Sequence, residues 1–420
     1  MKRPVVIGGG VAGLVACIEL ERAGHSPILL ESDETLGGRL QTDFVEGVPI
    51  DHGFQVVLTG YPEVRRLLDL AALDPIIFDS GARIFRSTGG APVLVADPRR
   101  QFADLMPTLR SGVVSTADAW RMWRHLRSIS GGRRLSRVFA REGRSTFEML
   151  EKRGYSVEFV DEFLRPFFGG IFLDRHLKTP EQMFNFVLKM FASGSAVLPR
   201  AGMQSVVKQL SDQLKTTHVR TGVRAHRVQD EGAGVETASG EVLAADGVVL
   251  AAPGLTTDVD GLLVRDDGMQ WNRTVRYVWS IAPDVRRFER PLIGLTPASK
   301  RITNMHFFKD LDAEWPDWVS VTVVGDPHDV VDIASDKDMR QEFQLATGIA
   351  VRETIAQHDV FHALPATGEL AYEPDPESCW LFDGVVKAGD DRTNPSFNGA
   401  ARSGAVAAEA LVKSWDGLPR

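Results

Sequence analysis

The first 30 residues alternate between short apolar runs and a longer amphipathic stretch. Val5–Ile7 is an apolar run of strand length, the glycines Gly8–Gly10 follow it, and Leu14–Ala23 repeats apolar residues at helical spacing. Gly24 is a natural helix C-cap, and the apolar run Pro27–Leu30 has the length of a second strand. This pattern predicts a strand–helix–strand unit with a glycine-rich turn at the start of the helix.

The spacing of apolar residues changes twice further along the chain. Between about residue 100 and residue 192, apolar residues recur at helical spacing, and the predicted helices are Thr116–Ile129, Ser145–Lys152, Val157–Leu164 and Pro180–Phe191. Short runs between glycine-containing turns then predict strands at Thr217–Arg220, Arg224–Val228, Gly234–Thr237 and Val242–Leu243, before Ala245–Pro253 returns to the first sheet.

Residues from about 268 to 372 contain segments with strand-like spacing of apolar residues and one segment with helical spacing. Thr274–Ile281 and Val319–Val324 read as strands, and Asp336–Ala350 reads as a helix. These segments predict an antiparallel sheet flanked by helices. Since no repeat and no low-complexity linker separates the regions, we expect interleaved domains.

Composition excludes several classes of protein. A chain of 420 residues with 43% hydrophobic content can bury a large core, and its net charge of −8 offers no electrostatic footprint for nucleic acid. The two cysteines, Cys17 and Cys379, form neither a disulfide framework nor a metal site. We therefore expect no nucleic-acid partner and no bound metal, and the sequence does not indicate an oligomeric state.

The N-terminus superficially resembles a secretory signal. Met1–Arg3 is basic and precedes a small apolar run, but consecutive glycines, Glu19 and Glu21 interrupt that run and no cleavage site follows. No later run reaches the roughly 20 apolar residues that a membrane span needs. The expectation is a soluble, cytoplasmic protein.

The glycine turn carries the first recognisable chemistry. Gly8 permits the tight turn, Gly10 lets the backbone approach a pyrophosphate, and Gly13 lets the helix pack on the strand. The phosphates would meet the helix N-terminus at Gly10, Val11 and Ala12. Glu31, which ends the second strand, would accept hydrogen bonds from ribose hydroxyls. The unit is therefore predicted to bind a dinucleotide.

A second glycine pair, Gly37–Gly38, follows this unit and leads into Arg39, whose donor fork suits a pyrophosphate. With these residues the chain resembles the flavin-containing amine oxidoreductase superfamily, which includes amine oxidases, protoporphyrinogen oxidases and phytoene desaturases. The resemblance implies FAD as the cofactor. Because no cysteine lies between Asp390 and Gly399, the FAD is expected to be held non-covalently.

The C-terminal region extends the resemblance. Val385–Asp390 reads as a strand that ends in Gly389 and Asp390, and Ser396–Gly404 opens a helix that continues through Leu411. The resemblance implies that Asp390 binds the ribityl chain or a water near the phosphates. It also implies that the backbone amides around Asn398, Gly399 and Ala400 face the flavin pyrimidine, and that the backbone of Val223 meets adenine.

The resemblance also predicts the architecture: an α/β fold with a Rossmann-like FAD-binding domain of the amine-oxidase type, an interleaved α+β substrate domain and a helical cap. The FAD-binding domain is expected to comprise residues 1–85, 195–265 and 378–420. The substrate domain is expected to comprise residues 86–194 and 266–377, with its helical part at about 100–192.

Two aromatic stretches, Phe163–Leu173 and Met183–Phe191, read first as core, although they would also suit the wall of an apolar pocket. In carotenoid and porphyrinogen enzymes a comparable helical cap lines the substrate channel and dips into a bilayer. The predicted function is thus an FAD-dependent oxidase, dehydrogenase or desaturase acting on a hydrophobic compound such as a polyene or a porphyrinogen. Its electron acceptor would be O2 or another oxidant, and peripheral membrane contact is the alternative to a fully cytoplasmic location.

Other functions stay open. An amine oxidase would commonly carry a tyrosine just before the last helix, where this chain has Ser396–Asn398. A flavin-dependent isomerase and a flavin-free partner-binding protein share the same fold. His52 and Lys300 are the candidates for catalytic side chains, although a histidine that satisfies a turn beside Asp51 is the simpler interpretation of His52.

Overall fold

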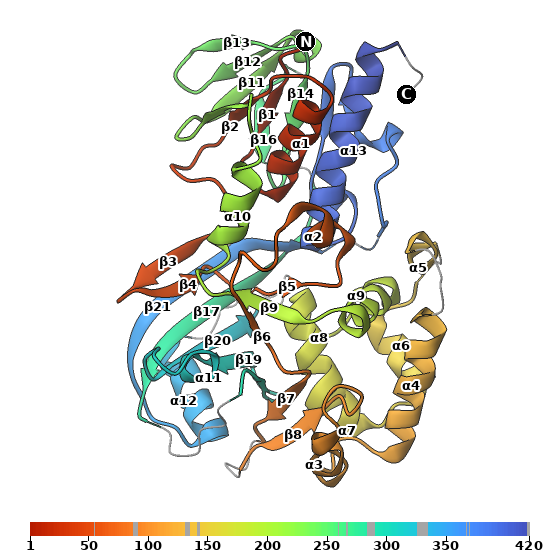
Figure 1. The fold of residues 1–420 in the computed structure, drawn as a ribbon, viewed down its shortest axis with the longest axis vertical. Coiled ribbons are helices and arrows are strands. Elements are labelled where there is room, and N and C mark those ends of the chain that lie inside the picture. The colour runs from red at the N-terminus through yellow and green to blue at the C-terminus, as the bar shows by residue number, and fades with distance from the viewer. Residues whose placement is uncertain are drawn as a thin grey trace.

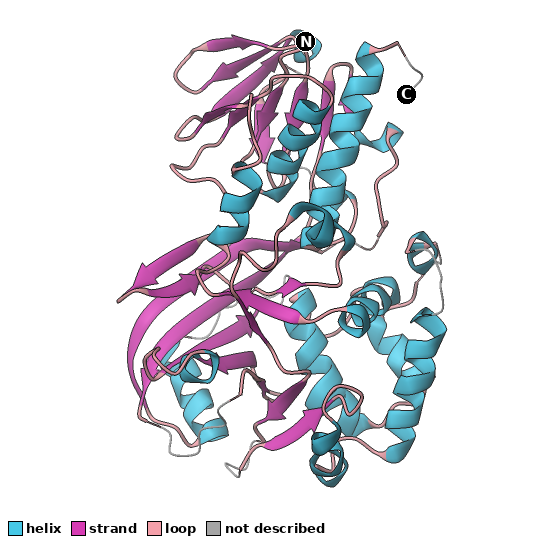
Figure 2. Ribbon diagram, viewed as in Figure 1, coloured by secondary structure: helices cyan, strands magenta, loops and turns pink. Residues whose placement is uncertain are grey.

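The computed structural model describes residues 1–53, 55–86, 91–130, 135–140, 143–258, 260–265, 268–283, 290–325, 335–366, 368 and 370–417. Figure 1 shows an elongated molecule with two parts. The upper part holds both ends of the chain, a sheet and the helices α1 (Val11–Arg22) and α13 (Phe397–Trp415). The lower part holds a larger sheet on one side and a group of helices on the other (Figure 2).

The upper sheet has six strands in the order β10-β2-β1-β14-β23-β22. All neighbours are parallel except β22 and β23, which are antiparallel. The strands are β1 (Val5–Ile7), β2 (Ile28–Leu30), β10 (His218–Arg220), β14 (Val248–Leu250), β22 (Trp380–Phe382) and β23 (Val385–Lys387). Three distant segments of the chain therefore build one sheet, and the apolar strands β1, β14 and β23 lie at its buried centre.

The strand at 217–220 differs from its predicted place. It was expected in the same meander as the three strands after it, but β10 pairs with β2 in the main sheet. The meander contains only β11 (Ala225–Gln229), β12 (Gly234–Thr237) and β13 (Val242–Ala244). The apolar pattern of a strand indicates its length and burial but not the strand it pairs with, so the pairing of β10 with β2 could not be predicted from the sequence.

The helices α1 and α13 lie side by side against the upper sheet (Figure 1). A glycine makes their close approach feasible, because a Cβ at Gly404 would lie 2.1 Å from the carbonyl oxygen of Ala12. This contact fixes the start of the first helix against the last helix, so the two ends of the chain meet where the glycine turn lies.

The lower sheet has seven strands in the order β21-β17-β20-β19-β18-β7-β8. Its neighbours are antiparallel, as predicted for residues 268–372, except that β18 and β7 are parallel. The strands are β7 (Gly81–Ile84), β8 (Val93–Ala96), β17 (Trp271–Ile281), β18 (Ile293–Leu295), β19 (Ile302–Phe307), β20 (Trp318–Val324) and β21 (Val351–Pro365). α12 (Asp336–Thr347) covers one face through Phe343, whose ring meets Trp279 at 5.6 Å.

The helical group confirms the helices predicted between residues 100 and 192. It consists of α3 (Leu105–Arg110), α4 (Thr116–Ser130), α5 (Ser136–Phe139), α6 (Thr146–Lys152), α7 (Val157–Phe159), a wide π-type turn at Val160–Leu164, α8 (Arg165–Phe172) and α9 (Glu181–Ser193). α8 had no predicted secondary structure. Pro166 is tolerated near its start, and Gly170 allows contact with β19, where an added Cβ would lie 2.4 Å from the side chain of Asn304.

Short elements connect the two parts. They are the hairpin of β3 (Thr42–Val45) and β4 (Val48–Asp51), the small sheet of β5 (Val57–Leu58), β9 (Ala196–Pro199) and β6 (Pro75–Ile77), and the helices α2 (Pro62–Leu67) and α10 (Gln204–Ser211). The pair β15 (Leu255–Thr257) and β16 (Leu263–Arg265) belongs to the upper part, where β16 packs against β11 (Figure 1).

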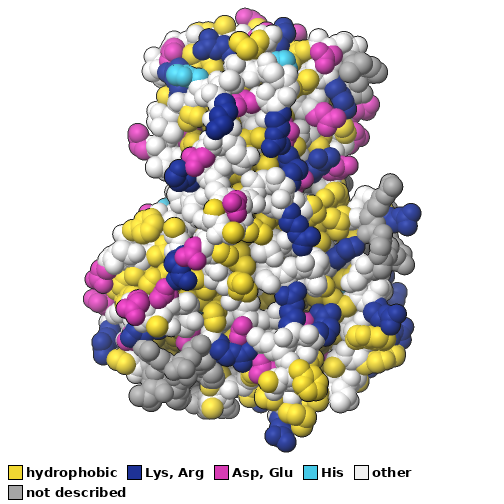
Figure 3. All heavy atoms as spheres, viewed as in Figure 1, with side chains coloured by type: hydrophobic (Ala, Val, Ile, Leu, Met, Phe, Trp, Pro, Cys, Tyr) yellow, Lys and Arg dark blue, Asp and Glu magenta, His cyan; other side chains and the backbone are white. Residues whose placement is uncertain are grey.

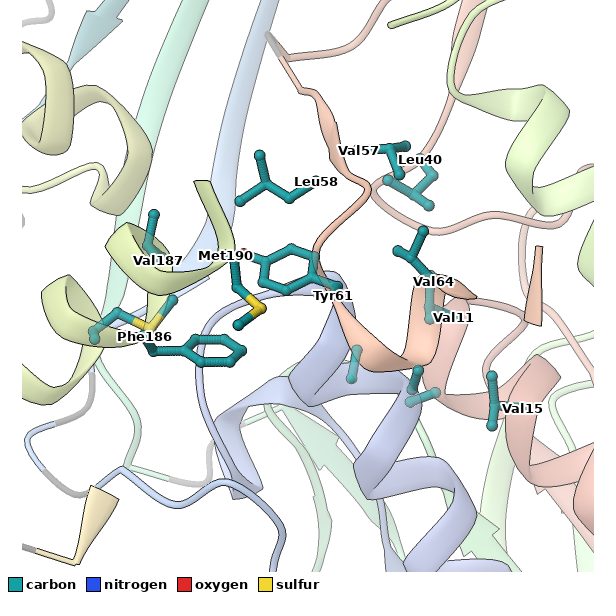
Figure 4. Packing of buried hydrophobic residues seen from close by; sticks show 14 of the residues in the cluster. Val11, Val15, Leu40, Val57, Leu58, Tyr61, Val64, Phe186, Val187 and Met190 are labelled. Carbon is teal, nitrogen blue, oxygen red and sulfur yellow. The ribbon is translucent and has the colours of Figure 1, made fainter. Parts of the chain in front are cut away.

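A continuous hydrophobic core runs through this junction (Figure 4). Tyr61, at the start of α2, lies between Val64 and Val11 on one side and Phe186 and Met190 of α9 on the other. The rings of Tyr61 and Phe186 stack with 5.5 Å between their centroids. The upper part and the helical group therefore share one packed core.

Candidate functional site

A cavity of about 1270 Å³ extends from the glycine turn of the upper part to the helical group of the lower part. Pockets for a single small ligand typically measure about 300–1,000 Å³, so this cavity has room for more than one. The predicted site residues that line it are Gly8, Gly10, Val11, Ala12, Glu31, Gly37, Gly38, Arg39, Val223, Gly389, Asp390 and Ala400. Gly13, Asn398, Gly399, His52 and Lys300 lie outside its lining.

The glycines of the first turn have different structural roles. Gly8 has φ +110°, and a Cβ there would lie 2.8 Å from the carbonyl oxygen of Ala251. A Cβ at Gly13 would lie 1.9 Å from the carbonyl oxygen of Gly8, so this glycine permits the helix to pack on the strand. At Gly10 an added Cβ would meet no atom within 4 Å, because this position opens on the cavity. The fold requires Gly8 and Gly13, and Gly10 keeps space free for a ligand.

The N-terminus of α1 is suited to an anion. Its N-cap, Gly10, offers no side-chain hydrogen bond, and no acidic residue lies in its first turn. The first backbone N–H groups of a helix have no partner inside the helix, and the helix dipole adds positive potential there. Gly10, Val11 and Ala12 present this end to the cavity, which is the arrangement that binds a pyrophosphate.

Glu31 directly follows β2 and is 7% exposed. Its carboxylate accepts hydrogen bonds from the backbone N–H groups of Gly9 at 2.7 Å and Asp33 at 2.9 Å. Val223 is held beside it, since the Val223 N–H donates to the Glu31 carbonyl oxygen at 2.8 Å. This N–H is thus engaged within the protein, and only the carbonyl of Val223 is left to meet an adenine.

Arg39 makes a contact that differs from its expected one. It was expected to bind a phosphate, but its guanidinium donates to Asp390 Oδ2 at 2.9 Å and to Asp390 Oδ1 at 2.6 Å. It also donates to the carbonyl oxygen of Ala363 at 2.8 Å. Burial would lower the pKa of Arg39, but the charge of Asp390 raises it above its usual value. The two parallel hydrogen bonds fix the relative orientation of both side chains at the cavity wall.

The start of α13 is capped by its own residues. Ser396 Oγ accepts from the Gly399 N–H at 2.9 Å, and the Ser396 carbonyl accepts from the Ala400 N–H at 3.0 Å. These two amides, which were expected to face a flavin, are therefore engaged inside the helix. Asn398 is fully buried, and its Nδ2 has no hydrogen-bond partner among the residues that the structure describes.

Three further residues at this end were not predicted as site residues. Lys387 and Asp391 form a buried ion pair of 3.2 Å that spans Gly389, and Asp391 lines the cavity. Their spacing of four residues was visible, but the segment read as an apolar strand and the turn that brings the pair together was not predictable. Tyr61 also lines the cavity, and its hydroxyl contacts Ser396.

The two candidate catalytic side chains lie elsewhere. His52 Nε2 is 3.0 Å from Asp43 Oδ2, and its ring stacks on that of His358. Lys300 lies in a turn after β18, where its carbonyl oxygen accepts from Arg175 at 2.5 Å. Since neither residue lines the cavity, the geometry gives no support to their predicted catalytic role.

The far end of the cavity is aromatic. Phe163 stacks between Phe159 at 5.6 Å and Phe167 at 5.5 Å, and Phe167 also meets Phe191 at 5.5 Å. All four rings line the cavity together with Leu164, Phe168, Ile171, Met183 and Leu188. The stretches that read first as core are thus core on one side and cavity wall on the other.

These observations fit a dinucleotide such as FAD. The open space at Gly10, the uncapped end of α1 and the carboxylate of Glu31 lie along one wall, and Asp390 with Arg39 lies further along the same cavity. Cys17 and Cys379 are absent from the lining, so the described cavity offers no thiol for a covalent bond.

Comparisons with known proteins agree with this fit. The model of the family described as flavin containing amine oxidoreductase matches residues 11–256. The chain is 37% identical to polyamine oxidase 5 of Oryza sativa subsp. japonica over 90 residues, which are 21% of this chain and 17% of that protein. It is 27% identical to protoporphyrinogen oxidase 2 of Arabidopsis thaliana over 174 residues, which are 40% of this chain and 32% of that protein. The matched region is less than a third of the length of these curated relatives.

The fold is shared by solved structures along nearly the whole chain. One is a putative protoporphyrinogen oxidase from Exiguobacterium sp. 255-15, which superposes with a TM-score of 0.68 and 17% identity and covers 98% of this chain and 99% of that one. At this level of identity the likeness concerns the fold alone, and it agrees with the predicted α/β architecture of the amine-oxidase type.

Proposed function

The chain belongs to the flavin containing amine oxidoreductase family, a family of FAD-dependent oxidoreductases, and we propose that this member oxidises a large hydrophobic substrate such as a polyene or a porphyrinogen-like compound. When bound, FAD supplies the acceptor for the hydride that leaves the substrate. The final electron acceptor in this proposal is O2 or another oxidant.

The cofactor would be held without a covalent bond by three separate segments. Gly8, Gly10, Val11 and Ala12 would meet the pyrophosphate, and Glu31 would bind the adenosine ribose. Asp390, oriented by Arg39, would accept hydrogen bonds near the ribityl chain. In the same proposal the FAD-binding domain comprises 1–85, 195–265 and 378–420, and the substrate domain comprises 86–194 and 266–377.

One observation carries the substrate class. The same cavity is lined by Gly10 and Asp390 and by the ring stack of Phe159, Phe163 and Phe167. Water in such an aromatic space gains few hydrogen bonds, so an extended apolar molecule binds there by displacing it. An alternative amine substrate has less support, because Ser396 and Phe397 stand where an amine-binding tyrosine would be expected.

We also propose that the substrate enters the cavity from a membrane surface. Figure 3 shows apolar atoms on the surface at the lower end of the molecule. Large apolar side chains are exposed on α3, α4 and the turn before α3, namely Phe102, Met106, Trp120 and Trp123. Arg124 and Arg127 lie 4.7 Å and 4.9 Å from the tryptophan rings, so apolar surface and positive charge occur together. Tryptophan and arginine in this combination suit the interface of a bilayer with anionic lipids. Trp123 also lines the cavity, which links this surface to the site. No helix in the described part of the chain is long and apolar enough to span a membrane.

Anaerobic mixing of the oxidised protein with candidate substrates tests the proposal. We expect the flavin absorbance to bleach with a polyene or a porphyrinogen and to stay unchanged with polyamines and aromatic amines. Bleaching with amines alone would replace the proposed substrate class by the amine-oxidase alternative. Conversion of an apolar substrate without any bleaching under anaerobic conditions would instead indicate an isomerase.

A further inference from the structure

Two histidines and one aspartate meet at the edge of the lower sheet, apart from the cavity. Asp43 lies on β3, His52 directly follows β4, and His358 lies on β21. His52 Nε2 is 3.0 Å and His358 Nε2 is 3.1 Å from the same atom, Asp43 Oδ2. The potential ligand atoms of the three side chains all lie within 4.8 Å of one another.

Their arrangement has the dimensions of a metal site. Zinc binds imidazole nitrogen and carboxylate oxygen at about 2.0–2.2 Å, so neighbouring ligand atoms of a tetrahedral site lie roughly 3.3 Å apart. The two observed separations of 3.0 Å and 3.1 Å need only small adjustments to reach this value. The imidazole rings stack with 4.4 Å between centroids and 17° between planes, so one ring has to rotate about its side-chain bonds for both Nε2 lone pairs to reach the same cation.

The cation next to the cluster is engaged elsewhere in the protein. Arg276 on β17 lies opposite His358 in the register of β17 and β21. Its guanidinium donates to the carbonyl oxygen of Asp51 and to Ser320 Oγ, and the Asp51 carboxylate offsets its charge.

We propose that Asp43, His52 and His358 form a binding site for one zinc-like divalent cation. Two imidazoles with one carboxylate suit zinc and its neighbours among the transition metals better than calcium or magnesium. Asp43 is 56% exposed at its side chain, so a water molecule completes the coordination from the solvent side. The site is independent of the proposed oxidoreductase activity.

The cation would join the β3–β4 hairpin to β21. The last residues of β21 line the cavity, and the Ala363 carbonyl accepts a hydrogen bond from Arg39. A metal bound at His358, midway along this strand and directly before the residues that line the cavity, would therefore stabilise one wall of the cavity from behind. We assign it a structural role, since no atom of the three ligands belongs to the cavity lining.

Equilibrium dialysis of the full-length, FAD-containing protein against Zn²⁺ after chelator treatment tests the site, with the bound metal counted by mass spectrometry. We expect one Zn²⁺ per chain, and at least tenfold weaker binding in both Asp43→Asn and His358→Ala. His226→Ala, which removes an exposed histidine on β11, is the matched control and should bind as the wild type does. Equal affinity in the wild type and both ligand variants would overturn the proposal.

A second measurement needs no variant and covers the case in which a variant fails to fold. One equivalent of Cu²⁺ added to the wild-type protein should give an electron paramagnetic resonance spectrum with hyperfine coupling to two imidazole nitrogens. A spectrum without nitrogen coupling would contradict the site, and Asp43 would then simply accept hydrogen bonds from two histidines.

Discussion

Arg39 donates two hydrogen bonds, of 2.6 Å and 2.9 Å, to the carboxylate of Asp390, which lies 351 positions later in the chain. The pair connects the loop after the first βαβ unit to the turn before the last helix. Asp390 is 3% exposed, and its partner is fixed further by the Ala363 carbonyl. A single ion pair thus links the two ends of the candidate cofactor site to the lower sheet.

Replacing the arginine with lysine should weaken FAD binding. In Arg39→Lys one point charge replaces the two parallel donors, so Asp390 loses its fixed orientation. Since a hydrogen bond to a charged group contributes roughly 1.5–3 kcal/mol, we expect FAD affinity to fall by about 10- to 100-fold. Titration of the apoprotein with FAD, followed by flavin fluorescence, measures this change.

Arg220→Lys is the control for that experiment. Arg220 makes a comparable two-bond pair with Glu241, at 2.9 Å and 2.7 Å, but lies outside the cavity lining. Its FAD affinity should equal that of the wild type. If both variants lose affinity to the same extent, the effect of Arg39 is a general loss of stability.

The glycine turn yields a pair of substitutions with opposite outcomes. Gly10→Ala places a methyl group in open space, so the protein should fold with an unchanged melting temperature but bind FAD at least tenfold more weakly. Gly13→Ala places the same group 1.9 Å from the Gly8 carbonyl oxygen, which should lower the free energy of unfolding by at least about 2 kcal/mol. Thermal melts of the two apoproteins separate these effects, and equal melting temperatures would contradict them.

Much of this architecture was predictable because the signals are local. The glycine turn, the helix after it and Glu31 at the end of β2 each follow from a few adjacent residues. The pairing of Arg39 with Asp390 is different, since both residues are also suited to bind a cofactor directly. Only the folded structure shows that Arg39 and Asp390 bind each other.

The same limit applies to the residues that were missed or misplaced. The Lys387–Asp391 pair depends on a turn through Gly389 that local propensity does not define. His52 was a plausible acid or base by residue type, but its partners Asp43 and His358 come from two strands, one of them some 300 residues away along the chain. Long-range partners decide the role of a titratable side chain, and a single sequence does not supply them.

The stability of the helical group should depend on pH through His125. This residue on α4 is fully buried, and its Nε2 donates to Asn185 Oδ1 at 2.6 Å. Burial, followed by the charge of Arg153, lowers the pKa of His125 from 6.5 to about 4. Between these values the unfolded chain binds a proton that the folded protein does not, so stability is complete above pH 6.5 and falls as the pH drops toward 4.

The loss over this window should reach roughly 3 kcal/mol. Urea unfolding at pH 7.0, 6.0, 5.0 and 4.5 measures it, and His125→Gln should show a flatter profile over that range. The exposed His218 serves as control, since His218→Gln should keep the slope of the wild type. An identical slope in His125→Gln would show that other groups cause the acid sensitivity.

The exposed aromatic surface predicts binding to vesicles. The double variant Trp120→Glu and Trp123→Glu places carboxylates where two rings lie, and we expect its sedimentation with vesicles of mixed neutral and anionic phospholipid to fall at least fivefold. Leu345→Glu changes an equally exposed apolar residue on α12 and should bind as the wild type does. Wild-type protein that stays in the supernatant would remove the membrane contact from the proposal.

The most direct measurement concerns the cofactor that the three chain segments are proposed to hold. Purified protein should be yellow, with one flavin per chain, and denaturation followed by filtration should release that flavin as intact FAD. Gly10→Ala, purified in parallel, should contain less flavin at the same protein yield. A flavin that stays attached to the denatured chain, or a colourless protein that FAD does not reconstitute, would contradict a non-covalent FAD site built from the glycine turn, Arg39 and Asp390.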